Sequence, residues 1–377
     1  MQPRTIVAAP GAEPQEVFWS WVDRACRETA RELIEWTLGR LQDRAVGAGW
    51  HERTSARAGY RNGVYRRTLT SPYGRLRIDV PRVRGASLDC RLVFDRYRRR
   101  CRDVDRVLRR VFLMGVSLRD AAEVGEQLWG HRLSHQAVAA LMRWLDGRLA
   151  AWRGMPLEAA YPVVQIDGMY VTVEGRKRTV MLVMGLRDNG TKAVLGFSVT
   201  RGEACRDLLW DLRRRGLEGV ELFVTDDSGA IRSALEEVYP EVPRQVCAWH
   251  RLVALWTRLG PVPWRGRMVR EAGRIFRCVS LAAALQEAER WARRWAARAQ
   301  DTVAWLLDGL ADSLVFYHLP QPWWRRTRTT SLVERLIRKL RRRLRPMGAF
   351  ANTPAAERAV FGQLLRWHLL AEITHRT

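Results

Sequence analysis

The chain of 377 residues is long enough for about two or three domains, and its hydrophobic fraction of 47% excludes a wholly disordered protein. Its 65 lysines and arginines outnumber 40 acidic residues and give a net charge of +25, which indicates a polyanionic partner such as nucleic acid. Six cysteines without CxxC spacing argue against a disulfide framework or a zinc ribbon, and no apolar run could cross a membrane, so we expect a cytoplasmic, nucleoid-associated protein.

The N-terminal part of the chain predicts one long helix and then a hairpin. Hydrophobic residues recur at helical spacing over 14–45, so residues 1–58 form a helical region whose role rests on composition alone. From Tyr60 to Arg84 hydrophobic and polar residues alternate on either side of a turn-prone segment, 71–74. We therefore expect a basic β-hairpin region at 59–100.

Residues 101–150 have the pattern of short helices joined by glycine turns. Helical spacing runs from Val104 to Phe112 and stops at Gly115, and a second run breaks at Gly130. Ser134 can then cap the next helix, which we expect to carry Leu141, Trp144 and Leu145. This is the arrangement of a DNA-binding helix-turn-helix. Plain core packing of short helices accounts for the same pattern, and the surrounding arginines favour DNA binding.

Residues 151–258 predict an α/β sheet. The first expected strand comprises 162–166 and 170–173, and two further strands follow at 179–186 and 192–199. A helix at 203–215, closed by Gly216, comes next. The remaining elements are a strand at 220–225, a helix at 229–238 and a strand at 244–246. Gly168 marks a bulge or kink in the first strand. Three antiparallel strands, a helix and a strand parallel to the first is the strand order of a ribonuclease-H-like core.

Each of the two parallel strands ends in an acid, Asp167 and Asp226. Because active groups gather outside the carboxyl ends of neighbouring strands, we expect these two carboxylates to approach each other. Residues 259–322, rich in Trp and Arg, predict a helical insertion. The core resumes at 323–377, where a hydroxyl residue in Thr329–Ser331 can cap a helix that carries Glu334.

Asp167, Asp226 and Glu334 together suit metal-dependent phosphodiester chemistry. Two hard cations can activate an attacking oxygen and stabilise the leaving oxygen, and Mg²⁺, for which Mn²⁺ substitutes, prefers carboxylate ligands. We expect Asp167 to bridge both ions, and Asp226 and Glu334 to hold one each. Taken singly, each acid is better explained as a turn cap or an arginine partner, and only the joint pattern favours metal binding.

The acids stand in basic surroundings. Cys247 and His250 form a Cys-x-x-His pair. Because no second pair at ligand spacing accompanies it, we expect a buried cysteine and a hydrogen-bonded histidine that support the active site, and not a zinc site. The arginines that we expect to contact DNA phosphates are Arg61, Arg119, Arg328, Arg335, Arg338, Arg341, Arg342 and Arg345.

From about Tyr60 to Phe350 the chain resembles the Mutator-type DDE transposases of bacterial insertion sequences. The matching segments are Tyr60-Arg61-Asn62-Gly63 with Gly74 and Pro81-Arg82, Gly115-Val116-Ser117-Leu118-Arg119-Asp120, Ile166-Asp167-Gly168-Met169-Tyr170, Gly196-Phe197, Thr225-Asp226, Cys247-Ala248-Trp249-His250 and Thr329-Thr330-Ser331-Leu332-Val333-Glu334.

The resemblance implies that Asp167, Asp226 and Glu334 are the catalytic acids and that Cys247 and His250 match the family's C/D-x-x-H signature. It also implies cut-and-paste or copy-out reactions on terminal inverted repeats. Two positions depart from the family pattern. Ser331 stands where Asn is common, and Asp227 follows Asp226 where a small or neutral residue is usual, which leaves open which of the two binds metal, although the strand boundary favours Asp226.

The sequence therefore predicts a DNA transposase that binds the inverted repeats of an insertion sequence and catalyses metal-dependent strand cleavage and transfer. Its expected partners are the element ends and target DNA, bound as a homodimer or higher oligomer and without a membrane. The alternatives are a domesticated, catalytically silent DNA-binding protein and a related ribonuclease-H-like nuclease such as a junction resolvase.

Overall fold

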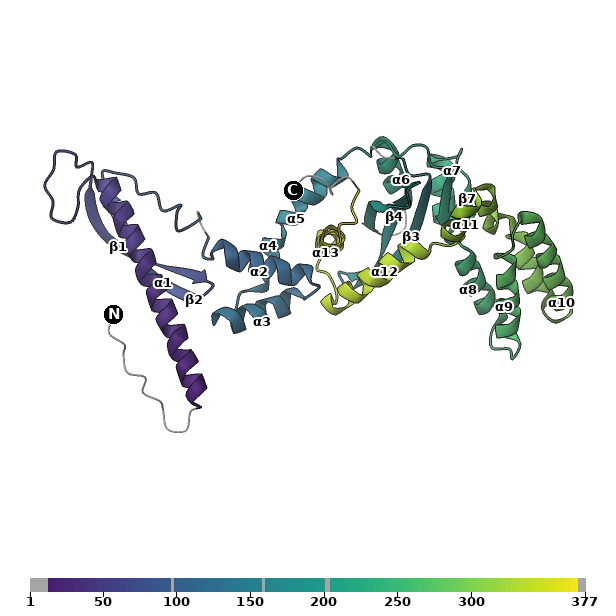
Figure 1. Cartoon of the computed structure of the whole chain (residues 1–377), viewed down its shortest axis with the longest axis horizontal. Coiled ribbons are helices and arrows are strands. Elements are labelled where there is room, and N and C mark those ends of the chain that lie inside the picture. The colour runs from purple at the N-terminus through teal and green to yellow at the C-terminus, as the bar shows by residue number, and fades with distance from the viewer. Residues whose placement is uncertain (1–12, 96–97, 158–159, 201–203, 372–377) are drawn as a thin grey trace. The chain divides into compact units, whose positions relative to one another are not determined.

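The computed structural model describes residues 13–95, 98–157, 160–200 and 204–371. The chain divides into two compact units, Met1–Met142 and Arg143–Thr377 (Figure 1). The prediction of a mixed α/β protein is confirmed, because helices accompany a two-stranded sheet in the first unit and a five-stranded sheet in the second. No helix of the described ranges is both long and apolar enough to span a membrane.

The first unit begins with helix α1 (Pro14–Val46) and the hairpin of β1 (Tyr60–Ser71) and β2 (Gly74–Arg84), as predicted. The strands pair antiparallel across the tight turn from Ser71 to Gly74. The C-terminal half of α1 lies across the hairpin (Figure 1), where Leu38 packs with Ile78 and their neighbours in a small core. The predicted basic segment at 96–100 lies partly outside the described residues.

Three short helices complete the first unit: α2 (Arg102–Leu113), α3 (Leu118–Trp129) and α4 (His135–Met142). The predicted cap is present, because the Ser134 hydroxyl accepts a hydrogen bond of 3.2 Å from the Ala137 amide. One expectation was wrong. The helix that Ser134 begins does not run on through Trp144 but stops at Met142, and α5 (Trp144–Arg153) starts anew in the second unit, although neither Gly nor Pro marks this break.

The sheet of the second unit has the order β5-β4-β3-β6-β7. Strands β3 (Val163–Val173), β4 (Arg176–Leu186) and β5 (Lys192–Thr200) pair antiparallel, whereas β6 (Leu222–Thr225) pairs parallel with β3, and β7 (Arg244–Val246) pairs parallel with β6. The predicted strand sequence is therefore confirmed.

Helices cover both faces of this sheet. On one face α6 (Ala204–Arg214) and α7 (Gly229–Val238) pack against Ile166 and Phe223. The predicted start of α6 at Glu203 lies outside the described residues. On the other face, Val163 and Val224 join a core built largely from the helices that follow β7.

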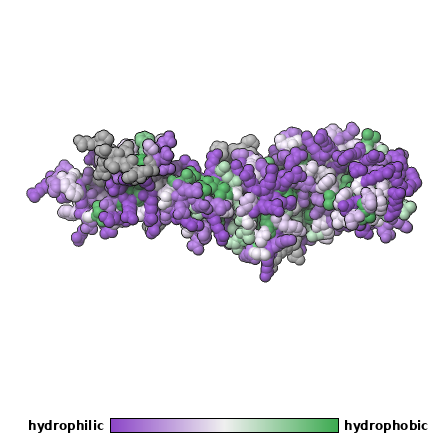
Figure 2. Space-filling model, turned by 90° about the horizontal axis from the view of Figure 1, so that it is seen from below, coloured by the Kyte–Doolittle hydropathy of each residue, from purple (hydrophilic) through white to green (hydrophobic). Residues whose placement is uncertain are grey.

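Those helices begin at Ala248, earlier than the position 259 expected from sequence. In chain order they are α8 (Ala248–Leu259), α9 (Arg265–Ile275), α10 (Leu281–Asp308), the short turns η1 (Ala311–Ser313) and η2 (Val315–His318), α11 (Gln321–Thr327), α12 (Ser331–Leu344), η3 (Arg345–Met347) and α13 (Thr353–Arg366). Figure 2 shows a predominantly hydrophilic face with scattered hydrophobic residues, in keeping with the charged composition.

The expected bulge at Gly168 is absent. The register of β3 with β4 runs without a shift from Val163 to Val173, and Gly168 pairs with Met181. The glycine has a packing reason instead, because a Cβ at this position would lie 3.2 Å from the Cγ2 atom of Thr179. A register shift occurs at Val183 and Met184, where β4 meets β5.

Candidate active site

Asp167 and Asp226 occupy equivalent places on neighbouring parallel strands. Gln165 of β3 pairs with Val224 of β6, and each aspartate lies two residues further along its strand, so both start from the same face of the sheet. Asp167 is buried, with 7% of its surface exposed, and Asp226 is half-buried. The sheet therefore brings together two carboxylates that are 59 residues apart in sequence.

Asp227, the neighbouring acid, is engaged elsewhere. Its carboxylate lies 3.1 Å from the Arg251 guanidinium and 3.2 Å from that of Arg232. Asp226 instead accepts a hydrogen bond of 3.2 Å from the Ser228 amide at one carboxylate oxygen. The strand end thus directs Asp226, and not Asp227, toward the face that carries Asp167.

Glu334 lies in the first turn of α12, which packs against β3. The local hydroxyl cap expected for this helix is absent, because none of the side chains at its start caps it. The cap comes from Gln165 of β3, whose Oε1 atom accepts hydrogen bonds of 3.2 and 3.3 Å from the amides of Leu332 and Val333. A strand residue two positions before Asp167 therefore holds the helix that carries Glu334.

Gln165 fixes this segment with its other end as well. Its Nε2 atom donates to the carbonyl oxygens of Arg326 and Thr329, at 2.8 and 3.1 Å. All four partners are backbone groups between Arg326 of α11 and Val333 in the first turn of α12, and the Gln165 side chain is completely buried. These contacts determine where the chain returns to the sheet.

A second buried glutamine occupies the same row of the sheet. Val224 pairs with Gln165 on one side and with Gln245 of β7 on the other, so the three side chains share one face. Gln245 donates to the Ser313 carbonyl at 2.8 Å and accepts from the Phe316 amide at 2.9 Å. The row formed by Gln165, Val224 and Gln245 thus binds the chain segments that pack against this face of the sheet. The residues two positions further along the three strands are Asp167, Asp226 and Cys247.

The positioning roles of Gln165 and Gln245 were not predicted from the sequence. The available signal was a polar residue inside an otherwise apolar strand, in Val163-Val164-Gln165-Ile166. Such a residue is costly to bury unless its amide finds partners, and so it marks a place where another segment docks.

Cys247 connects the two halves of the site. Its backbone amide donates to the Thr225 carbonyl of β6 at 2.7 Å, and its sulfur accepts from the amide and the hydroxyl of Thr330, each at 3.4 Å. The residue before Asp226 and the residue that precedes α12 are thus joined through one buried cysteine. His250, one turn along α8, places its Nε2 atom 3.8 Å from a Glu334 carboxylate oxygen.

The electrostatics of these groups are coupled. Burial raises the pKa of Asp167 to about 6, an effect that the Asp226 and Glu334 carboxylates reinforce and that the Gly168 amide and His250 oppose. Interaction with the Cys247 thiol raises the pKa of His250 to about 9 despite its burial. Burial also acts to raise the pKa of Cys247, but His250 and Thr330 outweigh it, and the pKa is lowered. These interactions favour the protonated form of His250 beside Glu334.

The donor set fits a hard divalent cation. The Asp226 and Glu334 carboxylates both act on the buried Asp167 and raise its pKa, and a bound cation would relieve this repulsion. Among the residues that the structure describes, the grouping of possible metal ligands whose atoms lie within 4.8 Å of one another is Cys247, His250 and Glu334. The Cys247 sulfur also accepts hydrogen bonds from Thr330, and the two aspartates lie outside that grouping.

Arginines line the exposed side of α12. Arg335, Arg338, Arg341 and Arg342 are exposed along this helix, whose first turn holds Glu334, and Arg345 is exposed directly after its end. Arg328, by contrast, is half-buried and donates to the Phe276 carbonyl at 2.9 Å. A polyanion that reaches Glu334 would therefore meet the arginines of α12.

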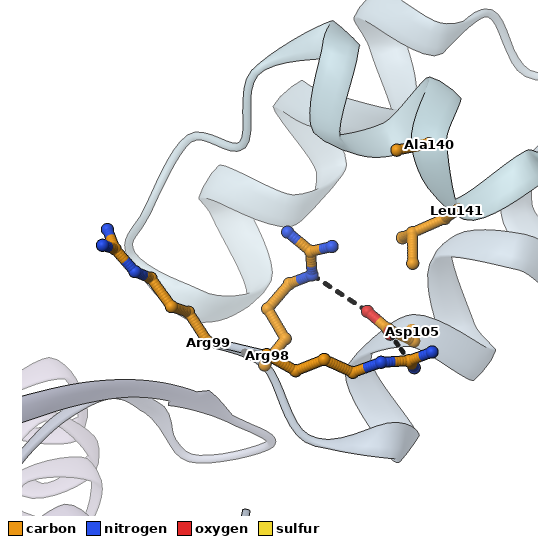
Figure 3. Close-up of a pocket in the computed structure, with 6 residues that line it drawn as sticks. Arg98, Arg99, Asp105, Ala140 and Leu141 are labelled. Carbon is orange, nitrogen blue, oxygen red and sulfur yellow. Dashed lines mark hydrogen bonds and ion pairs between the residues drawn. The ribbon is translucent and has the colours of Figure 1, made fainter. Parts of the chain in front are cut away.

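The remaining predicted arginines lie in the first unit. Arg119 is exposed on α3, whereas Arg61 is partly buried and binds the Asp43 carboxylate at 2.5 Å and the Ala48 carbonyl at 2.7 Å. A further pocket of the first unit is lined by Arg98, Arg99 and Arg100, and the buried Asp105 pairs there with Arg98 and Arg100. Figure 3 shows Arg99 pointing away from Asp105.

Sequence comparison gives the class of protein that carries this site. The profile of the family described as "Transposase, Mutator family" matches residues 10–368, and the chain belongs to that family.

Individual relatives agree with this assignment. The chain is 30% identical over 349 residues to the transposase for insertion sequence element ISRM5 of Rhizobium meliloti, covering 91% of this chain and 87% of that protein. It is 31% identical over 328 residues to the transposase for insertion sequence element IS406 of Burkholderia multivorans, covering 84% and 83%. It is 28% identical over 336 residues to the transposase for insertion sequence element IS256 in transposon Tn4001 of Staphylococcus aureus, covering 86% and 85%.

Proposed function

We propose that this chain is the transposase of an insertion sequence, which binds the terminal inverted repeats of its element and catalyses metal-dependent DNA cleavage and strand transfer. One observation carries the proposal. Asp167 and Asp226 leave the same face of neighbouring parallel strands, and Gln165 fastens the helix of Glu334 to one of those strands. Family membership supports the same conclusion.

We assign the sheet of the second unit to a ribonuclease-H-like core. Its order β5-β4-β3-β6-β7, with an antiparallel meander followed by two parallel strands, supports this assignment. The helices between Cys247 and α12 correspond to the helical insertion, and α12 and α13 complete the core. In this arrangement the insertion separates Asp226 from Glu334 in sequence, and Gln165 fastens the start of α12 to β3, the strand of Asp167.

The cofactor that suits the three acids is Mg²⁺, two ions per site, with Mn²⁺ as a substitute. Asp167, Asp226 and Glu334 are the residues that would hold these ions. When bound, such ions supply an activated attacking oxygen and stabilisation of the leaving oxygen in an in-line displacement.

The chain's own residues do the rest. His250, whose Nε2 atom lies 3.8 Å from Glu334, orients the Glu334 carboxylate, and the α12 arginines bind the phosphates on either side of the scissile bond. Because both element ends and the target DNA must be held at once, the active form is a homodimer or a higher oligomer on DNA.

The test uses purified full-length protein with Mg²⁺ and DNA that carries the ends of its own element. We expect cleavage at the ends and joining to target DNA. Asp167→Ala, Asp226→Ala and Glu334→Ala should each abolish both reactions and leave DNA binding intact. Asp227→Asn is the matched control, because this acid is paired with arginines, and it should retain activity.

The outcome separates the alternatives. Full activity of Asp167→Ala would refute the assignment of the acids. Binding without cleavage by the wild-type protein would indicate a catalytically silent DNA-binding protein. Hydrolysis without any strand transfer would indicate a related nuclease.

A further inference from the structure

Helix α1 carries hydrophobic side chains on two sides. Ala30, Ile34, Leu38 and Leu41 face the hairpin and pack in its core. A second set, which we call the outer stripe, consists of Phe18, Val22, Leu33 and Trp36. Successive members are 4, 11 and 3 residues apart, which at about 100° per residue places all four within a sector of about 60°.

The outer stripe is exposed to an unusual degree for such large side chains. Of the outer stripe, Phe18 is 44% exposed, Leu33 61% and Trp36 65%, whereas Val22 is half-buried; the adjacent Trp19 is 59% exposed. Scattered exposed hydrophobic residues are ordinary, but a row of them along one helix marks a binding surface.

The N-terminal half of α1 has little support from the rest of its unit. Among the described residues of this 33-residue helix, the fully buried side chains are Leu38, Gln42 and Val46, all in its C-terminal half. Figure 1 shows the N-terminal half of α1 extending beyond the hairpin. Helices draw most of their stability from packing of a hydrophobic face, so these turns need a partner.

The charge of α1 distinguishes protein from nucleic acid as that partner. Its sequence holds five arginines and six acidic residues, in a chain whose net charge is +25. Phosphate backbones would gain nothing from such a helix. Two copies of it would meet without an excess of like charge, with both signs available to pair beside the apolar contact.

We propose that the outer stripe of α1 is the contact surface for a second copy of this chain, so that two α1 helices pack against each other through Phe18, Val22, Leu33 and Trp36. A twofold pair suits the surface, because the same apolar side chains of each helix then contact those of the other. Such a contact is closed and leaves no further outer stripe exposed. The inference goes beyond the proposed function, which requires two copies at the element ends but does not say where they meet.

The test measures the mass of the full-length protein by sedimentation or light scattering, without DNA or metal. Wild type should be a dimer at micromolar concentration. Leu33→Glu with Trp36→Glu should be a monomer, with dimer affinity weakened about a hundredfold or more, since buried aromatic contacts dominate such interfaces. The milder Trp36→Ala should give an intermediate shift. Val279→Glu with Leu285→Glu is the matched control, because these exposed residues of the second unit are 79% and 47% accessible, and it should remain a dimer.

Three results would overturn the inference: a wild-type monomer throughout this concentration range, an unchanged dimer in Leu33→Glu with Trp36→Glu, or a loss of DNA binding in that variant at constant mass. Unchanged circular dichroism and melting temperature check that the variant is folded. The measurement needs no catalysis, so an inactive dimer would contradict the proposed function and leave this inference standing.

Discussion

Replacing Gln165 with leucine tests how the helix of Glu334 is held. The substitution keeps a side chain of similar size and leaves four backbone groups without their partner: the carbonyls of Arg326 and Thr329 and the amides of Leu332 and Val333. A buried polar group that loses its hydrogen bond costs about 1–3 kcal/mol. At the lower end of that range the four together give about 4 kcal/mol, which is large for a single substitution.

Hydrogen–deuterium exchange locates the effect. In Gln165→Leu the amides of Leu332 and Val333 should lose their protection, and the second unit should unfold at lower urea concentration. Gln245→Leu is the matched control from the same row of the sheet. It should expose the Phe316 amide, whose acceptor it removes, and leave the first turn of α12 protected.

Activity then separates positioning from stability. At a temperature where both variants are folded, Gln165→Leu should lower kcat for DNA cleavage far more than Gln245→Leu, because only Gln165 contacts the turn that holds Glu334. Equal protection of the α12 amides in wild type and Gln165→Leu would refute the reasoning, as would equal kcat values in the two variants.

Three further predictions concern the acids, the arginines and the strand. Because burial raises the pKa of Asp167 to about 6, the ionised carboxylate destabilises the fold above that pH. Asp167→Asn should therefore stabilise the metal-free protein by up to about 3 kcal/mol at pH 7, and this gain should vanish below about pH 4. Thermal melts in EDTA measure the difference. Arg338→Ala should lower the slope of log DNA affinity against log salt by about 1 and leave the melting temperature unchanged. Arg328→Ala removes a donor to a backbone carbonyl, so it should lower the melting temperature and leave the slope unchanged. Gly168→Ala should cost about 1 kcal/mol through contact with the Thr179 methyl group, and urea titration should show recovery in the double variant with Thr179→Ser; a loss that persists in the double variant would contradict the packing explanation.

Much of the secondary structure followed from sequence because its causes are local. The alternating pattern from Tyr60 to Arg84 specified a hairpin, and Ser134 specified a helix start, since both depend on residues within a few positions of each other. The run of strands from 162 to 246 was predicted in the same way. The strand end before Asp226 was also predicted, whereas Asp167, expected at a strand end, lies inside β3, which continues to Val173.

The errors arose where a distant residue decided the outcome. Gly168 was assigned to a bulge, but its reason is the Thr179 side chain on the next strand. The start of α12 was assigned a hydroxyl cap, but Thr330 donates to Cys247 and the cap comes from Gln165. Local sequence cannot report a hydrogen bond to a residue more than 160 positions away.

The sequence by itself determined the charge, most of the helices and strands, and which three acidic residues are candidates for metal binding. Helix and strand periodicity and residue chemistry are properties of short segments, which is why these features could be predicted. The tertiary structure alone decided which atoms meet. Gln165 binds the segment before Glu334, Cys247 joins Thr225 to Thr330, and Asp227 is paired with arginines while Asp226 is directed to the site. These choices depend on which polar groups find partners once the sheet is buried, and that is settled only when the whole second unit has folded.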